Sequence, residues 1–155
     1  MTTTTTIAEL PSLQGQELEA SPWIEVTQER VNTFADATDD HQWIHLDVER
    51  AKKEGPFGEP VAHGYLTLSL LIPMWSQMLT VTDATTVVNY GVNKVRFPSP
   101  VPAGGKIRLT ATLTDVAEVK GGLQVTVSAV IELEGGDKPV CVAEPIFRYY
   151  APKQS

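Results

Sequence analysis

Two long runs in the second half of the chain alternate between apolar and polar residues. The first covers Lys106 to Val119 and the second covers Leu123 to Glu134, with Lys120-Gly121-Gly122 between them. Side chains point alternately to the two faces of a β-strand, so this period predicts strands with one apolar face. The glycine pair predicts a hairpin turn that makes the two strands antiparallel neighbours.

Two further strands flank this hairpin in the sequence. Thr86 to Phe97 is rich in β-branched residues, and Gly91 inside it predicts a bulge. Lys138 to Tyr150 predicts the last strand, in which Pro145 indicates an edge position or a bulge. The breaker-rich segment 98–105 predicts a long turn.

Helical spacing dominates the first half of the chain. Thr27 to Thr38 repeats apolar residues at helical intervals, with Thr27 as the predicted N-cap. The main helix is predicted from Tyr65 to about Leu79, and it is apolar on nearly every side although Pro73 lies inside it. A helix that is apolar all round is a buried one. Asp47 is expected to cap a second, short helix over Val48 to Lys53.

These elements predict one α+β domain, an antiparallel sheet wrapped around a long central helix. We expect the domain to cover residues 11–155, after a flexible, threonine-rich segment over residues 1–10. At 155 residues the chain is long enough for one substantial core. The polar segment from Asp39 to Asp47 is expected to be a loop.

Composition and charge narrow the classes of function. The net charge of −7 and the pI near 4.9 argue against nucleic acid or an anionic membrane as a partner. The single cysteine, Cys141, lies in an apolar run, so we expect a buried, unreactive thiol and no disulfide. No stretch resembles a signal peptide or a membrane span, which makes a cytoplasmic protein the expectation.

The candidate chemistry lies between Ala37 and Ser69. Asp40 and His45 are five residues apart, and His63-Gly64 opens the main helix. A carboxylate and an imidazole can activate one water, and a helix N-terminus offers free N–H groups to a developing oxyanion. This suggests addition of water beside a carbonyl group, or its removal. Spacing alone also permits a capped turn with a solvated aspartate and a structural histidine.

Residues 40–47 read Asp-His-Gln-Trp-Ile-His-Leu-Asp, and Ala51, Phe57, Pro60-Val61 and His63-Gly64 follow in order. This series resembles the hydratase-2 signature of MaoC-like proteins, which are R-specific enoyl-CoA hydratases with the hotdog fold. The resemblance continues through residues 93–101 and covers most of the chain. The usual Asn-Pro is replaced here by Gln42-Trp43, a form found in a subgroup similar to a mycobacterial R-hydratase.

The resemblance implies roles for individual residues. Asp40 and His45 would be the catalytic pair, with Asp40 as base and His45 as acid, although shared or reversed roles stay open. Gly64 would lend its backbone N–H to the thioester oxygen, and His63 would be a hinge or a supporting residue rather than a general base. We also expect contacts with the substrate from part of this stretch and from the following strand: Gln42, Trp43, His63, Tyr65 and Asn93.

The function expected from the resemblance is hydration of a trans-2-enoyl-CoA to a (3R)-3-hydroxyacyl-CoA, or the reverse dehydration. No cofactor is expected beyond the coenzyme A of the substrate, and no metal, although Asp39, His41 and Asp47 add possible ligands near the pair. Dimers are usual in this family, and pairing of sheet edges makes a homodimer the expected assembly. A hotdog thioesterase and a non-catalytic acyl-thioester-binding protein are the alternatives.

Overall fold

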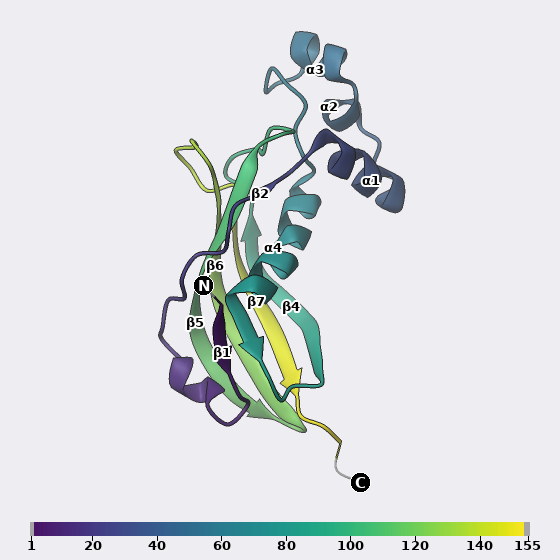
Figure 1. Ribbon diagram of the computed structural model, residues 1–155. Helices are drawn as coiled ribbons and strands as arrows, with labels where there is room; N and C mark the ends of the chain where they lie inside the picture. Colours follow the sequence, from purple (N-terminus) through teal and green to yellow (C-terminus); the bar gives the residue numbers. More distant parts are fainter. Residues whose placement is uncertain (1, 154–155) are drawn as a thin grey trace.

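The computed structural model describes residues 2–153, and its main feature is a five-stranded sheet that curls around one helix (Figure 1). All neighbouring strands in this sheet are antiparallel. In spatial order the strands are β2 (Ile24–Glu25), β5 (Lys106–Val119), β6 (Gly122–Leu133), β7 (Cys141–Tyr150) and β4 (Thr86–Arg96). The structure confirms the predicted α+β arrangement and the predicted β5–β6 hairpin.

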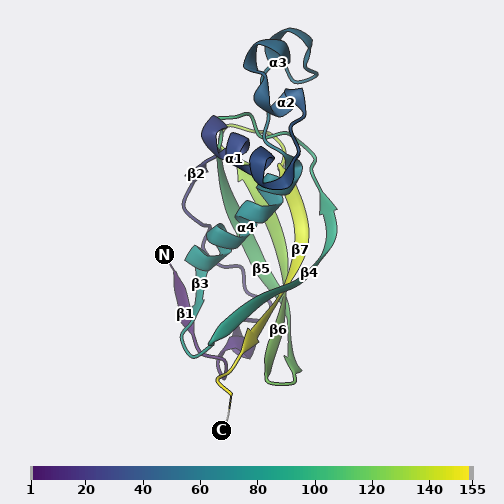
Figure 2. The same cartoon turned by 90° about the vertical axis from the view of Figure 1, so that its right-hand side faces the viewer.

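The alternating pattern places one face of β5, β6 and β7 in the core. Ile107, Leu109 and Leu113 on β5 are fully buried, and so are Val125 and Val127 on β6. These side chains face helix α4 (Gly64–Met78), which crosses the sheet in Figure 2. The apolar face of the sheet therefore packs on the apolar side of the central helix.

Helix α4 is exposed on one side, which corrects the prediction of a helix buried all round. Met74 and Met78 are buried, whereas the Tyr65 side chain is 71% exposed and Ser69 is exposed. The sheet curls around one side of the helix only, so its other side is left to solvent. The helix continues through Pro73, which lies on the exposed side. None of the helices in residues 2–153 is both long and apolar enough to cross a membrane.

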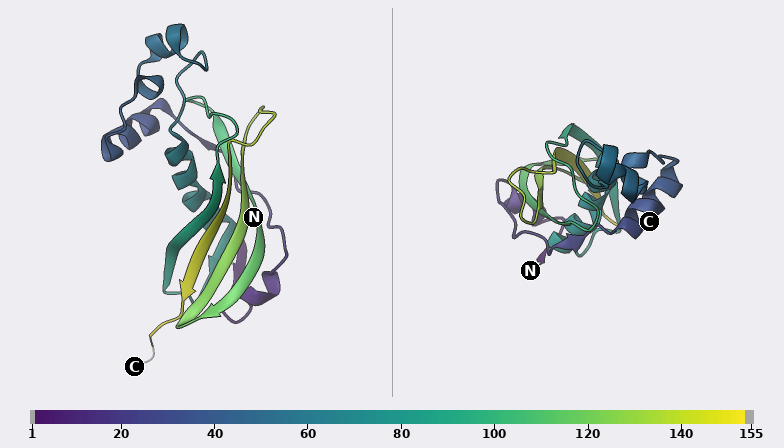
Figure 3. Two further views of the ribbon diagram at one scale, coloured as in Figure 1. Left: turned by 180° about the vertical axis from the view of Figure 1, so that it is seen from behind. Right: turned by 90° about the horizontal axis from the view of Figure 1, so that it is seen from above.

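Three helices stand together at one end of the sheet: α1 (Gln28–Thr38), α2 (Trp43–Leu46) and α3 (Val48–Glu54) (Figures 1 and 3). Two predicted caps are confirmed, because Thr27 accepts a hydrogen bond from the Arg30 amide and Asp47 accepts one from the Arg50 amide. The expectation of a continuous loop from Asp39 to Asp47 is wrong, since α2 forms one turn within it. The His45 and Asp47 amides close that turn on the carbonyls of Gln42 and Trp43.

The N-terminal residues differ from the expected flexible segment over residues 1–10. Thr3–Thr5 form strand β1, which pairs in parallel with β3 (Leu79–Val81), directly after α4. Leu10 is fully buried and opens a 3-10 turn, Leu10–Leu13, so an apolar side chain holds this segment to the core. Met1 and residues 154–155, which belong to the expected segments 1–10 and 11–155, lie outside the described residues.

Pro145 and Cys141 both lie in β7, and the sequence made a prediction for each of them. Pro145 indicated an edge position or a bulge. The edge position is wrong, because β7 lies between β6 and β4, whereas register shifts do occur in β4 on both sides of the Val92–Pro145 pair. The backbone accommodates Pro145 where pairing with β6 is interrupted, between the pairs Thr126–Ile146 and Ala129–Ala143. The bulge predicted at Gly91 is confirmed by a register shift in β4. Cys141 is buried as expected, and burial raises the pKa of its thiol to about 11.

Candidate active site

Asp40 reaches the site through a sharp turn at the end of α1. The helix ends at Thr38, and Asp39 follows with a left-handed backbone (φ 59°). Aspartate tolerates this conformation better than most residues because its short polar side chain can bond locally. The turn reverses the chain immediately before Asp40, whose side chain is exposed. Asp40 therefore lies between α1 and α2 with its carboxylate at the mouth of the site.

His45 is held by backbone contacts on the single turn α2. Its side chain is 7% exposed, and its Nδ1 lies 2.6 Å from the carbonyl oxygen of Val61. A carbonyl only accepts hydrogen bonds, so Nδ1 carries the proton and donates it. The Gln28 side-chain amide donates to the His45 backbone carbonyl at 2.8 Å and so ties α2 to α1. In the neutral ring, Nε2 is then left with a free lone pair.

The environment keeps His45 neutral over a wider pH range than usual. Burial lowers the pKa of His45 below its ordinary value of 6.5, and the neighbouring His63 lowers it further. The hydrogen bond to Val61 and the charge of Asp40 act in the opposite direction. At neutral pH the side chain is thus a proton acceptor at Nε2, with a carboxylate nearby that favours the protonated form once it is made.

His63 joins this pair from the start of α4. Its side chain is 2% exposed, and its ring stacks on the His45 ring with the centroids 3.9 Å apart. Its Nε2 donates to the backbone carbonyl of Asp40 at 2.9 Å. Polar ligand atoms of Asp40, His45 and His63 all lie within 4.8 Å of one another. The fold thus brings His63 to Asp40 and His45, although 18 or more positions separate it from them in the sequence.

The first turn of α4 offers free amide groups beside this cluster. The Leu66 and Thr67 amides donate to the His63 carbonyl, both at 3.1 Å, whereas the amides of Gly64 and Tyr65 have no partner within residues 2–153. A cavity of about 310 Å³ opens here, and both His45 and Gly64 line it. The Phe97 ring packs so closely on Gly64 that a Cβ there would lie 3.1 Å from it. A carbonyl oxygen in the cavity would meet the positive end of a 15-residue helix.

Within residues 2–153, this cluster has the composition of a metal site. Its orientation fits a metal poorly, because the two imidazole rings are stacked with their planes only 24° apart, whereas the ligands of a tetrahedral site converge on one point. In addition, His45 Nδ1 and His63 Nε2 already donate to backbone carbonyls. The other candidate ligands lie elsewhere: His41 contacts Asp36 at 3.0 Å, Asp39 turns the chain, and Asp47 caps α3. The arrangement therefore suits proton transfer better than metal binding.

The remaining predicted substrate contacts are not brought into this cavity. Gln42 is exposed at the N-cap of α2, and Trp43 is half-buried beneath the Arg50 guanidinium, 4.1 Å from the ring centroid. Tyr65 points outward, with its ring against the edge of Phe97. Asn93 is exposed on β4, where its backbone pairs with Glu144. A role for these four residues stays a prediction.

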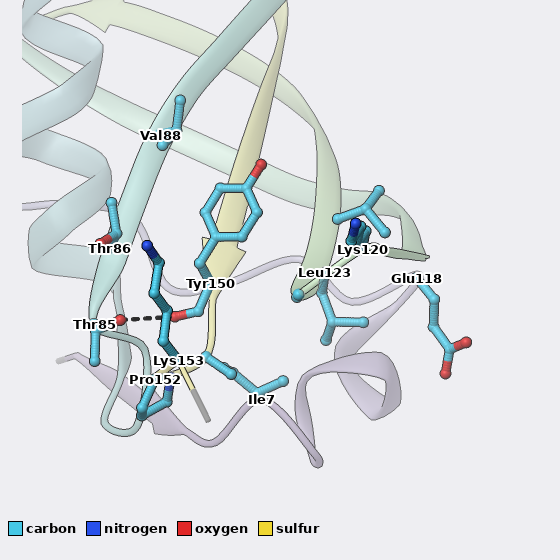
Figure 4. Close-up of a pocket in the computed structure, with 14 residues that line it drawn as sticks. Ile7, Thr85, Thr86, Val88, Glu118, Lys120, Leu123, Tyr150, Pro152 and Lys153 are labelled. Carbon is cyan, nitrogen blue, oxygen red and sulfur yellow. Dashed lines mark hydrogen bonds between the residues drawn. The ribbon is translucent and has the colours of Figure 1, made fainter. Parts of the chain in front are cut away.

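A larger cavity lies at the other end of the sheet, away from α1–α3 (Figure 4). It measures about 960 Å³ and is open on one side, among Ile7, Val88, Leu123, Tyr150 and the tail at Lys153. Neither a histidine nor a helix N-terminus is among its lining residues. Volume alone does not identify an active site, and the smaller cavity is the one that His45 and Gly64 line.

The sequence did not indicate the groups that hold His45 in place. The Val61 carbonyl sets the tautomer of His45. Every residue has a backbone carbonyl, so the residue type at position 61 does not reveal this contact. The Gln28 amide is equally inconspicuous, since glutamine on a helix surface is common. The Phe97 contact with Gly64 joins residues 33 positions apart and depends on how β4 ends beside α4. These contacts follow from the tertiary fold.

Comparison with known proteins gives one consistent result. The family model described as the MaoC like domain matches residues 9–134. The 3-hydroxyacyl-thioester dehydratase Z of Mycobacterium tuberculosis is 51% identical over 152 residues, which is 97% of this chain and 100% of that protein. Among solved structures, a monoamine oxidase regulatory protein from Archaeoglobus fulgius has a TM-score of 0.78 at 26% identity, covering 99% of both chains. The R-hydratase PhaJ1 from Pseudomonas aeruginosa shares the fold, with a TM-score of 0.74 at 23% identity, over 96% of this chain and 86% of that one.

Proposed function

Because the chain belongs to the MaoC-like dehydratase family and is a hydro-lyase with the hotdog fold, we propose that its reaction is the reversible hydration of a trans-2-enoyl-CoA. The product is a (3R)-3-hydroxyacyl-CoA. The observation that carries the proposal is the state of His45: its Nδ1–H is bound to Val61, so Nε2 is free beside the Asp40 carboxylate. No cofactor beyond the coenzyme A of the substrate is part of the proposal.

The thioester binds with its carbonyl oxygen at the free amides of Gly64 and Tyr65. Water adds to the β-carbon, the electron pair of the alkene moves toward the thioester oxygen, and negative charge develops there. Preorganised N–H donors stabilise such charge, and removal of one donor typically costs ~10² to 10³-fold in rate. The location of the free Gly64 amide at the cavity that His45 lines supports this orientation.

His45 takes the proton from the attacking water at Nε2 and returns a proton to the α-carbon. One O–H bond is broken and one C–H bond is made, so the imidazole ends the cycle neutral. The Asp40 carboxylate accepts a hydrogen bond from the water, orients it and favours the transient imidazolium. The tautomer of His45 supports this assignment, in which His45 is first the base and then the acid. It differs from the expectation from the sequence, which made Asp40 the base and left shared or reversed roles open.

Two smaller cavities support a place for the acyl chain. They measure about 330 and 380 Å³ and share Ile72, Asn89 and Phe147 as lining residues, so they adjoin each other along α4 and β4. Apart from Asn89, the shared lining is apolar, as an acyl chain requires. The acyl chain lies along α4 in this proposal, and the coenzyme A part lies outside the cavity.

We also propose a homodimer that covers the open side of α4 and β4. β4 is an edge of the sheet, and apolar side chains along it are exposed, among them Val87 (50%), Tyr90 (55%) and Val92 (41%). An uncovered apolar edge invites pairing, and a two-fold dimer satisfies both edges at once. The acyl-chain cavities lie on this same side, so a partner copy would close them.

The test of the reaction is loss of enoyl absorbance with crotonyl-CoA and with a longer 2-enoyl-CoA, followed by chiral analysis of the product. We expect (3R)-3-hydroxyacyl-CoA, and a fall in kcat of at least ~10²-fold in both Asp40→Asn and His45→Gln. His41→Gln is the matched control, since His41 lies outside the cavity and pairs with Asp36.

Three outcomes would contradict the proposal. Release of free coenzyme A without hydration would make the protein a thioesterase. Full turnover in Asp40→Asn or His45→Gln would remove these side chains from the mechanism, and binding of enoyl-CoA without turnover in the wild-type protein would favour an acyl-thioester-binding role.

A further inference from the structure

His63 contacts every part of the candidate site, although no proton-transfer step described above requires it. Its Nε2–H donates to the carbonyl of Asp40 at 2.9 Å, and its ring stacks on His45. Its own carbonyl accepts the Leu66 and Thr67 amides that begin α4. The loop that carries the carboxylate, the turn that carries the imidazole and the helix that carries the free amides therefore meet at this one residue.

The contacts of His63 define its chemical form. With the proton on Nε2, Nδ1 is an acceptor, and it is buried without a hydrogen-bond partner in residues 2–153. A proton on Nδ1 would create a buried charge with no acceptor, directly against the His45 ring. The neutral ring with Nε2–H is the form that fits. A side chain that only filled this space would not need an N–H donor. The hydrogen bond to the Asp40 carbonyl therefore indicates that His63 does more than pack against its neighbours.

We propose that His63 is a positioning residue for the hydration reaction: its N–H fixes the Asp40 backbone and its ring face fixes the plane of His45. This inference rests on the proposed function, because it gives His63 the task of holding the Asp40 carboxylate and the His45 imidazole in position for the attacking water. The ring of Phe34, 4.9 Å away, backs His63 from α1 and limits its movement. A displacement of reacting groups by about 1 Å costs ~10²-fold in rate, so a group that prevents it matters without touching the substrate.

Two substitutions separate the functions of the His63 side chain. His63→Phe keeps an aromatic ring for the stack with His45 but removes the donor to Asp40. His63→Gln keeps an N–H near the position of Nε2 but removes the ring. We expect His63→Phe to lower kcat for crotonyl-CoA ~10²-fold, with KM changed less than about threefold. His63→Gln should lower kcat only about tenfold, because it keeps the donor. His41→Phe, the same substitution at the exposed histidine, is expected to leave kcat unchanged.

The pH profile gives a readout that a purely structural role would not change. The titratable groups that act on His45 are His63, from the residue before α4, and Asp40, from the α1–α2 loop. The charge of Asp40 raises the pKa of His45, so a variant that releases the Asp40 backbone should let this pKa fall. The acid limb of kcat/KM should accordingly move to lower pH in His63→Phe, move less in His63→Gln, which keeps a donor, and stay in place in His41→Phe.

Spectroscopy tests the inference without any substrate. The chain has three histidines, so ¹⁵N-labelled histidine gives three sets of long-range ¹⁵N–¹H signals. We expect a fixed Nε2–H form for His63, a fixed Nδ1–H form for His45 and averaged tautomers for the exposed His41. This measurement on the wild-type protein remains decisive even if His63→Phe does not fold.

Each result has a clear meaning. Wild-type kcat in a folded His63→Phe protein, or a His63 ring that exchanges tautomers in the wild type, would overturn the positioning role. Absence of enoyl-CoA hydration by the wild-type protein would instead overturn the proposed function, while the tautomers would still report whether His63 holds Asp40 and His45 together.

Discussion

Gly64 is the position where the absence of a side chain has two consequences for the site. Its amide is one of the two free donors at the start of α4, and its α-carbon lies against the Phe97 ring. A methyl group here would sit 3.1 to 3.2 Å from three ring atoms, which requires the ring to move by a few tenths of an ångström. Phe97 is 38% exposed, so it has room to move, but it also lines the cavity with His45. The glycine thus matters more for the shape of the cavity than for the stability of the fold.

Gly64→Ala should therefore separate activity from stability. We expect the free energy of unfolding to change by less than ~1 kcal/mol, because alanine is also the better helix former. We expect kcat/KM to fall ~10²-fold, because the methyl group and the displaced ring obstruct the approach of the thioester oxygen to the amide. Urea unfolding and crotonyl-CoA kinetics measure the two effects. The double variant Gly64→Ala/Phe97→Leu should recover part of the activity, and Phe97→Leu alone is its control. Unchanged kinetics in Gly64→Ala would show that the thioester oxygen binds elsewhere.

At the scale of elements, the candidate site depends on the ends of helices. The end of α1 at Asp39 orients Asp40, the single turn α2 presents His45, and the start of α4 supplies the amides. Two local contacts fix these ends: Asp47, which ends α2, caps α3, and the bond from His63 to the Asp40 carbonyl joins the start of α4 to the residue after the α1 turn. Changes at a helix end should therefore affect the chemistry more than changes in the middle of the same helix.

Asp39 provides the test of this idea. A β-branched residue fits the left-handed backbone poorly, so Asp39→Val should lower the free energy of unfolding by ~1–2 kcal/mol, whereas Asp39→Gly should change it by less than ~1 kcal/mol. Asp39→Val should also lower kcat ~10²-fold by displacing Asp40. Thr27→Ala, which removes the cap at the other end of α1, costs a comparable ~1 kcal/mol and should leave kcat intact. Equal kinetic losses in Asp39→Val and Thr27→Ala would show that stability of α1, and not the turn, controls activity.

The sequence predicts elements whose signal is local and misses those that depend on distant contacts. The period-2 runs of β5 and β6 and the caps at Thr27 and Asp47 were predicted correctly, because each signal lies within a few residues. The position of Pro145 in an inner strand and the pairing of β1 with β3 were not, because both depend on strands far along the chain. For the candidate site, residue types indicated Asp40, His45 and Gly64, but the proton arrangement of His45 depends on a backbone carbonyl of Val61.

At the scale of the whole molecule, one surface differs from the rest. The side chains of β4 are exposed along nearly its whole length, and several of them are apolar, whereas β5, β6 and β7 bury alternate side chains. The open side of α4, with Tyr65, lies next to it (Figure 2). The net charge of −7 favours solubility, but it does not bury the exposed apolar side chains of β4. The proposed homodimer explains why this side is apolar, and it links assembly to activity because the acyl-chain cavities lie there.

Val92→Lys tests assembly and activity together. A lysine on the edge strand should oppose pairing of two β4 strands, because two like charges would meet across the two-fold axis. We expect light scattering after size-exclusion chromatography to give a dimer for the wild type and half that mass for Val92→Lys. Val48→Lys is the matched control, since Val48 is 36% exposed on α3 and Val92 is 41% exposed on β4.

If the dimer closes the acyl-chain cavity, Val92→Lys should lose activity with long 2-enoyl-CoA more than with crotonyl-CoA. It should regain this activity as the protein concentration rises. A wild-type protein that is monomeric and fully active at every concentration would show that one copy of the chain is sufficient.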